Sequence, residues 1–203
     1  MTRPEEPHPS DARLLAGIAR GEEEPFRILF KRWAPRLGRF LQGTTGSRET
    51  AEDLLQEAFL RILKAAPAFE PRGKAGSWMY RICANLAYSH WRRVRRARQA
   101  ARDETGVCCD LLGSAGSDPQ ERHAGSSFAA HVEAALGRLP ENQRMVFLLK
   151  VDQGLTYEEV ARVLACPVGT TKSRFHHAVR KLRTDLKVWD ERPDVSRRSP
   201  DVL

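Results

Sequence analysis

The apolar positions in the first half of the chain recur every three or four residues, and no segment alternates between apolar and polar side chains as a strand would. This spacing predicts consecutive amphipathic helices from Ser10 to about Arg102. The first long apolar stripe follows an acidic turn with Pro25 at its start and consists of Phe26, Leu29, Phe30, Trp33, Leu37, Phe40 and Leu41. Pro35 lies inside this stripe and should kink the helix or split it in two, because proline has no N–H to donate.

Two more helices are predicted before the arginine-rich region ends. The first starts near Ser47, ends before Pro67 and buries a stripe of Leu54, Leu55, Ala58, Phe59, Ile62 and Leu63. A loop that contains Pro and Gly follows, and Ser77 is then a candidate N-cap for a long helix through the arginines.

Residues 103–125 lose the helical period and gain Gly, Ser, Asp and Pro, which is the composition of a linker. Helical spacing returns with Phe128, Val132, Ala135, Leu136 and Leu139, after which Pro140 opens a helix that Gly154 ends. The sequence therefore predicts an all-α fold with helical domains at residues 10–100 and 126–187. A flexible linker at 101–125 joins them, and a polar, disordered tail occupies 188–203.

The charge of the chain points to a polyanionic partner. The formal net charge is +8, and one cluster of arginines meets no acidic residue before Asp103: Arg92, Arg93, Arg95, Arg96, Arg98 and Arg102. Such a cluster neutralises phosphates and releases their counterions, whereas a basic surface kept for solubility needs no clustering. The chain also lacks an apolar segment long enough for a signal peptide or a membrane span. We therefore expect no membrane insertion and a cytoplasmic location.

Cofactor and enzyme chemistry find little support in the sequence. The four cysteines contain no CxxC pair, and the adjacent Cys108 and Cys109 have no basic neighbour to activate a thiol, so we expect reduced, unreactive thiols. His176 and His177 point about 100° apart on a helix, and no third metal ligand is evident. The acidic residues lie on separate helix faces without a clustered metal site or a positioned nucleophile. We expect neither a cofactor nor an enzyme.

Residues 156–187 have the order of a helix-turn-helix: a short helix, a break at Cys166 and Pro167, and a second helix. The pattern predicts that Val160, Ala161 and Leu164 pack against Val168, Phe175 and Val179. The opposite face of the second helix carries side chains suited to base edges and phosphates, namely Thr170, Lys172, Ser173, Arg174, His176, His177 and Arg180. An ordinary helical hairpin with a solvated basic face is the alternative.

The long helix of the first half has a face that is both aromatic and basic. Trp78, Arg81, Asn85, Tyr88 and Arg92 are three or four residues apart, while Met79, Ile82, Cys83 and Leu86 line another face. Aromatic side chains among arginine and asparagine suit unstacked bases of a single strand better than a duplex groove. The alternative is that Trp78 and Tyr88 are core residues.

The preceding helix has a charged outer face formed by Asp53, Glu57, Leu60, Arg61 and Lys64. A solvated face with a pair between Glu57 and Arg61 accounts for the charges, and a docking site for a partner helix is the alternative that also accounts for Leu60.

At these residues the chain resembles the extracytoplasmic-function sigma factors, over residues 10–100 and 126–187. TAEDLLQEAFLRILK is similar to the polymerase-docking segment of that family, and SWMYRICANLAYSHWRR is similar to its promoter-melting helix. The segment LPENQRMVFLLKVDQGLTYEEVARVLACPVGTTKSRFHHAVRKLR is similar to its helix-turn-helix region. Three matches in this order, separated by a linker, are more specific than any one of them.

The resemblance implies a non-enzymatic promoter-recognition subunit of RNA polymerase. It implies that the coiled coil of the largest polymerase subunit contacts Asp53, Gln56, Glu57, Leu60 and Arg61. It also implies that bases of the melted minus-10 element are captured by Lys74, Trp78, Tyr80, Arg81, Asn85, Tyr88, Arg92 and Arg93. The duplex minus-35 element would be read by the helix-turn-helix face that runs from Thr170 to Arg180. Three positions depart from the family pattern: Ala165 replaces a usual glycine, Thr171 a usual valine and His177 a frequent arginine.

The partners implied by the resemblance are core RNA polymerase, promoter DNA in duplex and single-stranded form, and an anti-sigma factor. The rival function is a stand-alone helix-turn-helix regulator that binds a duplex operator as a dimer. That function explains residues 140–187 and leaves the docking helix and the face from Trp78 to Arg92 without a role.

Overall fold

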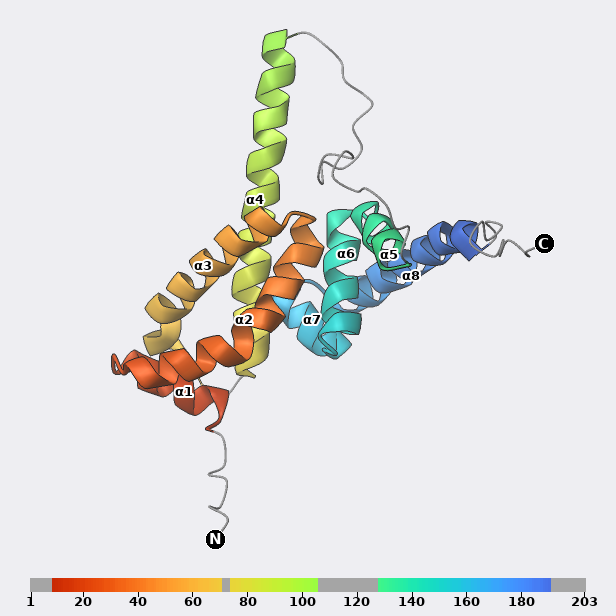
Figure 1. Cartoon of the computed structure of the whole chain (residues 1–203). Coiled ribbons are helices and arrows are strands. Elements are labelled where there is room, and N and C mark those ends of the chain that lie inside the picture. The colour runs from red at the N-terminus through yellow and green to blue at the C-terminus, as the bar shows by residue number, and fades with distance from the viewer. Residues whose placement is uncertain (1–8, 71–73, 106–127, 191–203) are drawn as a thin grey trace, which may run out of the picture.

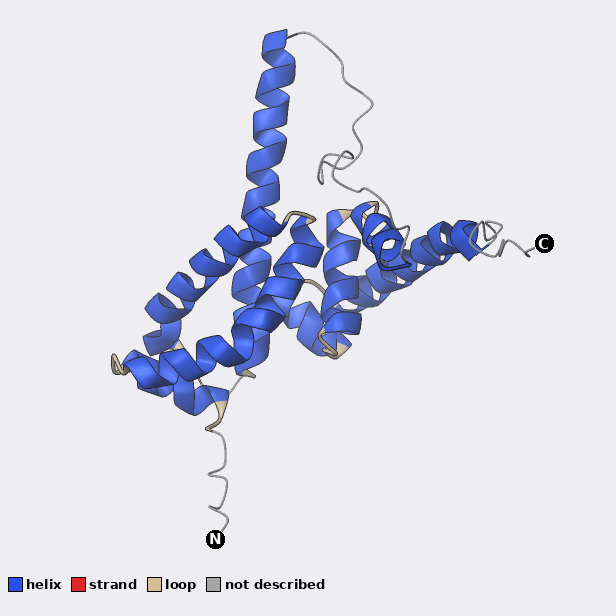
Figure 2. Ribbon diagram, viewed as in Figure 1, coloured by secondary structure: helices blue, strands red, loops and turns tan. Residues whose placement is uncertain are grey.

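The computed structural model describes residues 9–70, 74–105 and 128–190, and all regular structure in these ranges is helical (Figure 1, Figure 2). The all-α class is confirmed. An N-terminal module (9–105) consists of α1 (Asp11–Ala19), α2 (Glu23–Thr45), α3 (Arg48–Ala65), a 3₁₀ turn η1 (Ala66–Ala68) and α4 (Ala75–Thr105). A C-terminal module (128–190) consists of α5 (Phe128–Gly137), α6 (Glu141–Phe147), a π-helical turn η3 (Leu148–Asp152), α7 (Tyr157–Leu164) and α8 (Val168–Asp190). The pair Cys108 and Cys109 lies outside the described residues.

Pro35 does not split α2, which remains one helix from residue 23 to residue 45. Proline cannot donate to the carbonyl four residues earlier, which belongs to Lys31. Pro35 and Lys31 are both exposed, so the carbonyl that loses its donor lies on the solvent side of the helix. The helix therefore continues at a modest cost.

The long helix α4 starts earlier than expected, and Ser77 is not its cap. The backbone N–H of Trp78 already donates to the carbonyl of Lys74 at 3.2 Å, and the hydroxyl of Ser77 is buried without a hydrogen-bond partner. Gly76 explains the early start, because a Cβ there would lie 2.6 Å from the ring of Trp33. Only glycine allows the first turn of α4 to approach α2 so closely.

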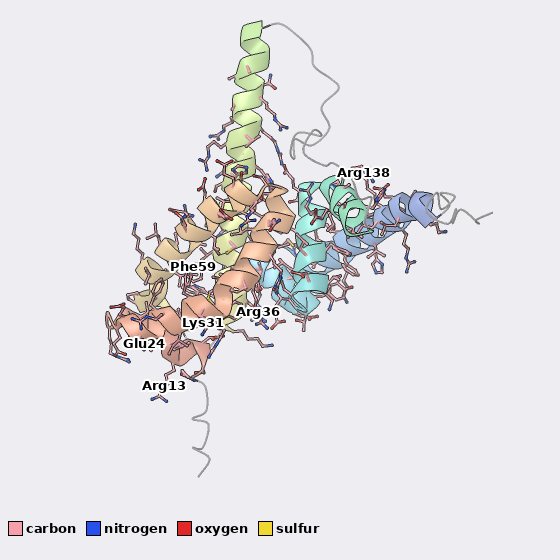
Figure 3. The ribbon with its side chains drawn as sticks, viewed as in Figure 1. Arg13, Glu24, Lys31, Arg36, Phe59 and Arg138 are labelled. Atoms are coloured by element: carbon pink, nitrogen blue, oxygen red, sulfur yellow. The ribbon has the colours of Figure 1, made fainter. Side chains whose placement is uncertain are left out.

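Both long helices also extend beyond their predicted ends. α4 reaches Thr105, five residues into the predicted linker, and its arginine-rich end projects beyond the other helices with its side chains pointing away from the axis (Figure 1, Figure 3). α8 reaches Asp190, three residues into the predicted tail. The alanine and arginine content of residues 95–102 favours helix, which accounts for the first extension.

The core of the N-terminal module follows the predicted stripes with one exception. α3 starts next to Ser47 as expected, and the hydroxyl of Ser47 caps it by accepting from the N–H of Thr50 at 3.2 Å. Phe59 lies between α2 and α3 (Figure 3) and is buried. Phe30 was expected on the buried stripe but is largely exposed, with its ring centroid 4.6 Å from that of Phe59.

The two modules share one apolar core. The main cluster of buried residues contains Leu37 and Met79 from the N-terminal module together with Leu149 and Val160 from the C-terminal module. A smaller cluster of Ala135, Leu139, Ala178 and Leu182 joins α5 and the loop after it to α8. The two predicted domains are therefore packed against each other, which the linker composition alone did not indicate.

Candidate nucleic-acid interface

The first helix of the α7–α8 hairpin is capped at both of its ends. The hydroxyl of Thr156 accepts from the N–H of Glu159 at 3.2 Å, and the Glu159 carboxylate accepts from the N–H of Thr156 at 2.8 Å. This capping box satisfies two of the free N–H groups at the start of α7. Ala165 ends α7 in the left-handed region, with φ of 49° and ψ of 46°. It is the only residue other than glycine with a positive φ in the described part of the chain.

The second helix of the hairpin presents the predicted basic face to solvent. Lys172, Ser173, His176, His177 and Arg180 are exposed, and Thr170 and Arg174 are half-buried. Thr171 and Ala178 on the opposite side are buried. Phe175 stacks on Phe147 with ring centroids 6.2 Å apart, so this aromatic side chain fixes α8 against α6. The surface from residue 170 to residue 180 is therefore a rigid, donor-rich helix face.

Along α4, the polar and aromatic members of the predicted face differ in exposure. Arg81, Asn85, Arg92 and Arg93 are exposed. Trp78 is half-buried and lies against Phe69 with ring centroids 5.1 Å apart. Tyr88 is also half-buried, at 5.6 Å from the ring of Trp91. The two aromatic residues thus combine core packing with partial access, and neither of the two alternatives from the sequence describes them fully.

Tyr80 is a correction to the predicted minus-10 set. Its side chain is only 2% exposed and packs edge-on against Trp33 and Phe40, with centroids 5.8 and 5.4 Å away. Its hydroxyl donates to the side-chain oxygen of Gln153 in the C-terminal module. Burial raises the pKa of the phenol, so it remains a neutral donor. Tyr80 is a core residue of α4.

Lys74 is exposed, but its ammonium group is paired across the two modules. Its Nζ lies 2.7 Å from a carboxylate oxygen of Glu159, whose side chain is almost fully buried. The pKa of Glu159 is lowered, mainly by this hydrogen bond from Lys74 and then by the backbone N–H of Thr156. The carboxylate that caps α7 is therefore also the partner of a predicted DNA-contacting lysine.

The predicted docking face of α3 is accessible. Asp53, Gln56, Leu60 and Arg61 are exposed, and Leu60 exposes 51% of its surface. Glu57 is half-buried and pairs with Arg61 at 2.8 Å, as the solvated-face alternative predicts. A single exposed leucine is normal on the surface of a folded protein, so the exposure of Leu60 is compatible with the solvated face and with the docking site.

Sequence reasoning did not identify the residues that join the two modules, above all Arg144. Its side chain is 6% exposed and donates to the backbone carbonyls of Thr44 at 3.0 Å, of Leu139 at 3.1 Å and of Gly137. Burial lowers the pKa of this guanidinium. Backbone carbonyls carry no residue-type signal, so the sequence could not indicate these partners. The spacing of Thr156 and Glu159 could have indicated the capping box.

Within the described ranges, no group of three or more histidine, cysteine or acidic side chains is placed to hold a metal ion. Cys83 and Cys166 are free thiols there, and burial raises the pKa of Cys83 to about 12. No described helix is long and apolar enough to cross a membrane.

Comparison with known proteins places both modules in one family. Two family models match, Sigma-70 region 2 over residues 29–97 and Sigma-70, region 4 over residues 130–182. The ECF RNA polymerase sigma factor EcfG of Rhodopseudomonas palustris is 34% identical over 159 residues, which are 76% of this chain and 81% of the relative. This chain belongs to the ECF sigma factors of the sigma-70 family. It is a sigma factor for promoter-specific transcription initiation, and sigma factors are non-enzymatic regulators of transcription.

Other relatives of this sigma factor have the same designation. The ECF RNA polymerase sigma factor SigE of Mycolicibacterium smegmatis is 32% identical over 158 residues, and the chain covers 60% of its length. The ECF RNA polymerase sigma-E factor of Escherichia coli is 28% identical over 174 residues, which are 83% of this chain and 90% of the relative.

Two solved structures resemble this sigma factor over both modules. The sigma factor RpoE in complex with the anti-sigma factor NepR from Bartonella quintana aligns with a TM-score of 0.66 and 28% identity. The alignment covers 81% of this chain and 98% of that chain. CnrH in complex with the cytosolic domain of CnrY aligns with a TM-score of 0.64 and 25% identity, over 88% and 97% of the two chains.

Proposed function

We propose that this sigma factor reads the two elements of its promoter with different modules and in different states of the DNA. The face of α8 from residue 170 to residue 180 contacts the duplex minus-35 element. The exposed side of α4, with Arg81, Asn85 and Arg92, captures bases of the melted minus-10 element, and Trp78 adds an aromatic surface. α3 docks on core RNA polymerase through Asp53, Leu60 and their neighbours. Because polymerase and the chromosome are in the cytoplasm, the chain acts there.

The observation that carries this proposal is the difference between the two helix faces. On α8 the exposed side chains of the predicted face are hydrogen-bond donors, and no exposed apolar side chain lies between them. Such a face suits the base edges and phosphates of a DNA groove. On α4 half-buried aromatic residues alternate with exposed arginine and asparagine, and aromatic rings stack on bases only after those bases leave the duplex. A stand-alone duplex binder has no use for the second surface.

We also propose that an anti-sigma factor controls the chain. RpoE of Bartonella quintana is solved in complex with the anti-sigma factor NepR, and CnrH is solved in complex with the cytosolic domain of CnrY. The two alignments cover 81% and 88% of this chain. Binding of a purified candidate partner that blocks transcription by this chain, and not by an unrelated sigma factor, is the expected result.

Run-off transcription tests the main proposal. Core polymerase, this chain and a library of genomic fragments are expected to yield transcripts with common start sites and two shared upstream elements. A chain that binds a duplex operator tightly without polymerase, and never yields a transcript with it, would instead be a stand-alone regulator.

The role of α8 has a separate test at Lys172, which is exposed and whose Nζ lies 5.8 Å from the ring centre of Tyr157. Lys172→Ala should weaken binding of the polymerase complex by about 1–3 kcal/mol if the lysine reads a base. If it contacts a phosphate, the log-log salt slope of binding should fall by about one. Arg13→Ala, which removes an exposed cation from α1, far from α8 (Figure 3), is the matched control. Unchanged affinity and salt slope for Lys172→Ala would remove this face from the DNA interface.

A further inference from the structure

A cleft of about 520 Å³ lies between α4 and the loop that joins α5 to α6. From α4 it is lined by Val94, Arg95 and Arg98, which share one face because Arg98 follows the other two by four and three positions. The loop contributes Arg138 and Leu139. Sites for small molecules in proteins have volumes of about 300–1000 Å³, so the cleft is large enough for a ligand the size of a nucleotide.

Four guanidinium groups and one carboxylate line this cleft, which we call the arginine cleft. The guanidinium groups belong to Arg95, Arg98, Arg138 and Arg144, and the carboxylate belongs to Glu141. Arg95 pairs with Glu141, and Arg138 pairs with Asp185 of α8 at 3.2 Å. Arg98 and Arg144 have no carboxylate partner among the described residues. The arginine cleft therefore holds two positive charges that no described side chain neutralises.

The charge of Arg144 is held inside the protein by backbone groups alone. Its side chain is 6% exposed, and its hydrogen bonds in the described residues go to the carbonyls of Thr44, Gly137 and Leu139. Its Nε is buried and has no partner there. Carbonyl dipoles orient a guanidinium group but do not cancel its charge, and buried charges in proteins are normally paired with an opposite charge. An anion in the arginine cleft would supply that opposite charge.

The other lining residues suit a ligand with an apolar part. Val94, Leu139 and Pro140 form an apolar wall beside the cations. His90 also lines the cleft, and its pKa is lowered by partial burial and then by the charge of Arg93. Its imidazole is therefore neutral at pH 7 and can donate one hydrogen bond.

We propose that the arginine cleft binds a small ligand with a di- or triphosphate group. The exposed side chains of Arg98 and Arg138 donate to phosphate oxygens, since a guanidinium group can donate to two oxygens of one phosphate. Arg144 adds a charge that its carbonyl partners hold in place. A ligand with two or more negative charges neutralises both unpaired cations, which a single carboxylate cannot do. This inference is independent of the proposed promoter contacts, because none of these arginines is assigned to DNA or to polymerase.

Isothermal titration calorimetry of the full chain with inorganic pyrophosphate and with ADP, both without divalent metal, measures the binding. Arg98→Gln removes an exposed cation without a described carboxylate partner, so the chain should remain folded and bind both probes about tenfold more weakly. Arg138→Gln should have a similar effect from the opposite wall of the cleft. Arg96→Gln is the matched control, because Arg96 is an exposed arginine of the same helix that does not line the cleft. Tighter binding of ADP would assign the site to nucleotides, and equal binding would assign it to inorganic diphosphate.

NMR signals of the histidine imidazoles locate the bound probe. The His90 signal should shift during titration with pyrophosphate, whereas the signal of His177, which is exposed on α8 and lies outside the cleft, should not. Absence of saturable binding by both probes would overturn the site. An equal loss of affinity in Arg96→Gln and Arg98→Gln, with an unmoved His90 signal, would show that phosphate binds diffusely along the arginine-rich end of α4 and would overturn it as well.

Discussion

Ala165 offers a direct energetic test of the turn between α7 and α8. The left-handed conformation at φ of 49° and ψ of 46° costs a residue with a Cβ about 1–2 kcal/mol, because the Cβ approaches the following carbonyl oxygen. Glycine has no such cost, but its greater freedom in the unfolded chain lowers the stability of the folded protein by about 0.4–1 kcal/mol. The side chain of Ala165 is exposed, so its removal loses no packing. Ala165→Gly is therefore expected to stabilise the protein by roughly 0.5–1 kcal/mol.

Differential scanning calorimetry measures this change. A gain of 1 kcal/mol in a chain of this size raises Tm by about 2–4 °C. Ala16→Gly, in the exposed middle of α1, is the matched control and should lower stability by about 1 kcal/mol, since glycine is a poor helix former. The strain assigned to residue 165 is refuted if Ala165→Gly melts at or below the wild-type temperature while the control behaves as expected.

Three further predictions concern other parts of the molecule. Thr44→Val keeps the shape of a side chain whose buried hydroxyl has no hydrogen-bond partner among the described residues. The free energy of unfolding measured in urea should therefore rise by about 1 kcal/mol, and a fall would contradict the absence of a hydrogen-bond partner. Asp53→Lys should abolish run-off transcription without lowering Tm, whereas Glu133→Lys, an equal charge change on exposed α5, should transcribe normally. The pKa of Glu159 is depressed below its usual 4.5, mainly by the hydrogen bond from Lys74, so the stability that this carboxylate contributes is present above pH 4.5 and is lost as pH falls through the folded-state value. Urea unfolding should show that the wild-type chain loses stability in that acid range and that Glu159→Gln loses less.

Local rules were enough to predict most of the helices. The spacing of apolar residues identified α2, α3 and α4, and the start of α3 near Ser47 was predicted, where the Ser47 hydroxyl accepts from an N–H only three residues away. Local rules failed where tertiary packing decided the outcome. Ser77 has the residue type of a cap, yet the contact between Gly76 and the ring of Trp33 allows α4 to begin at Ala75, three residues before the Trp78 that a cap at Ser77 would give.

The candidate site was predicted as two separate surfaces, and the structure packs the two modules that carry them against each other. The exposed face of α8 could be identified from the helical spacing of its own residues alone. The contact of Arg144 with the Thr44 carbonyl spans 100 residues of sequence and joins a side chain to a backbone atom, so neither spacing nor residue type could indicate it. The same holds for Gln153 as the partner of Tyr80, because a glutamine between two helices has no preferred partner in sequence.

The width of the buried sector of α4 explains why Tyr80 was misassigned. Its buried residues beyond the first turn are Met79, Tyr80, Cys83, Ala84, Leu86, Ala87 and Trp91. At about 100° per residue these positions span about 160°, whereas a helix that packs on one neighbouring layer buries a stripe of about 100°. The additional width corresponds to α2 and α7, which pack on α4 together with α3. The ring of Tyr80 meets Trp33 and Phe40 of α2 in this wide sector, and its hydroxyl meets Gln153 of the C-terminal module. An apolar sector wider than one neighbour requires thus indicates further packing partners, and for α4 one of these partners is α7 of the other module.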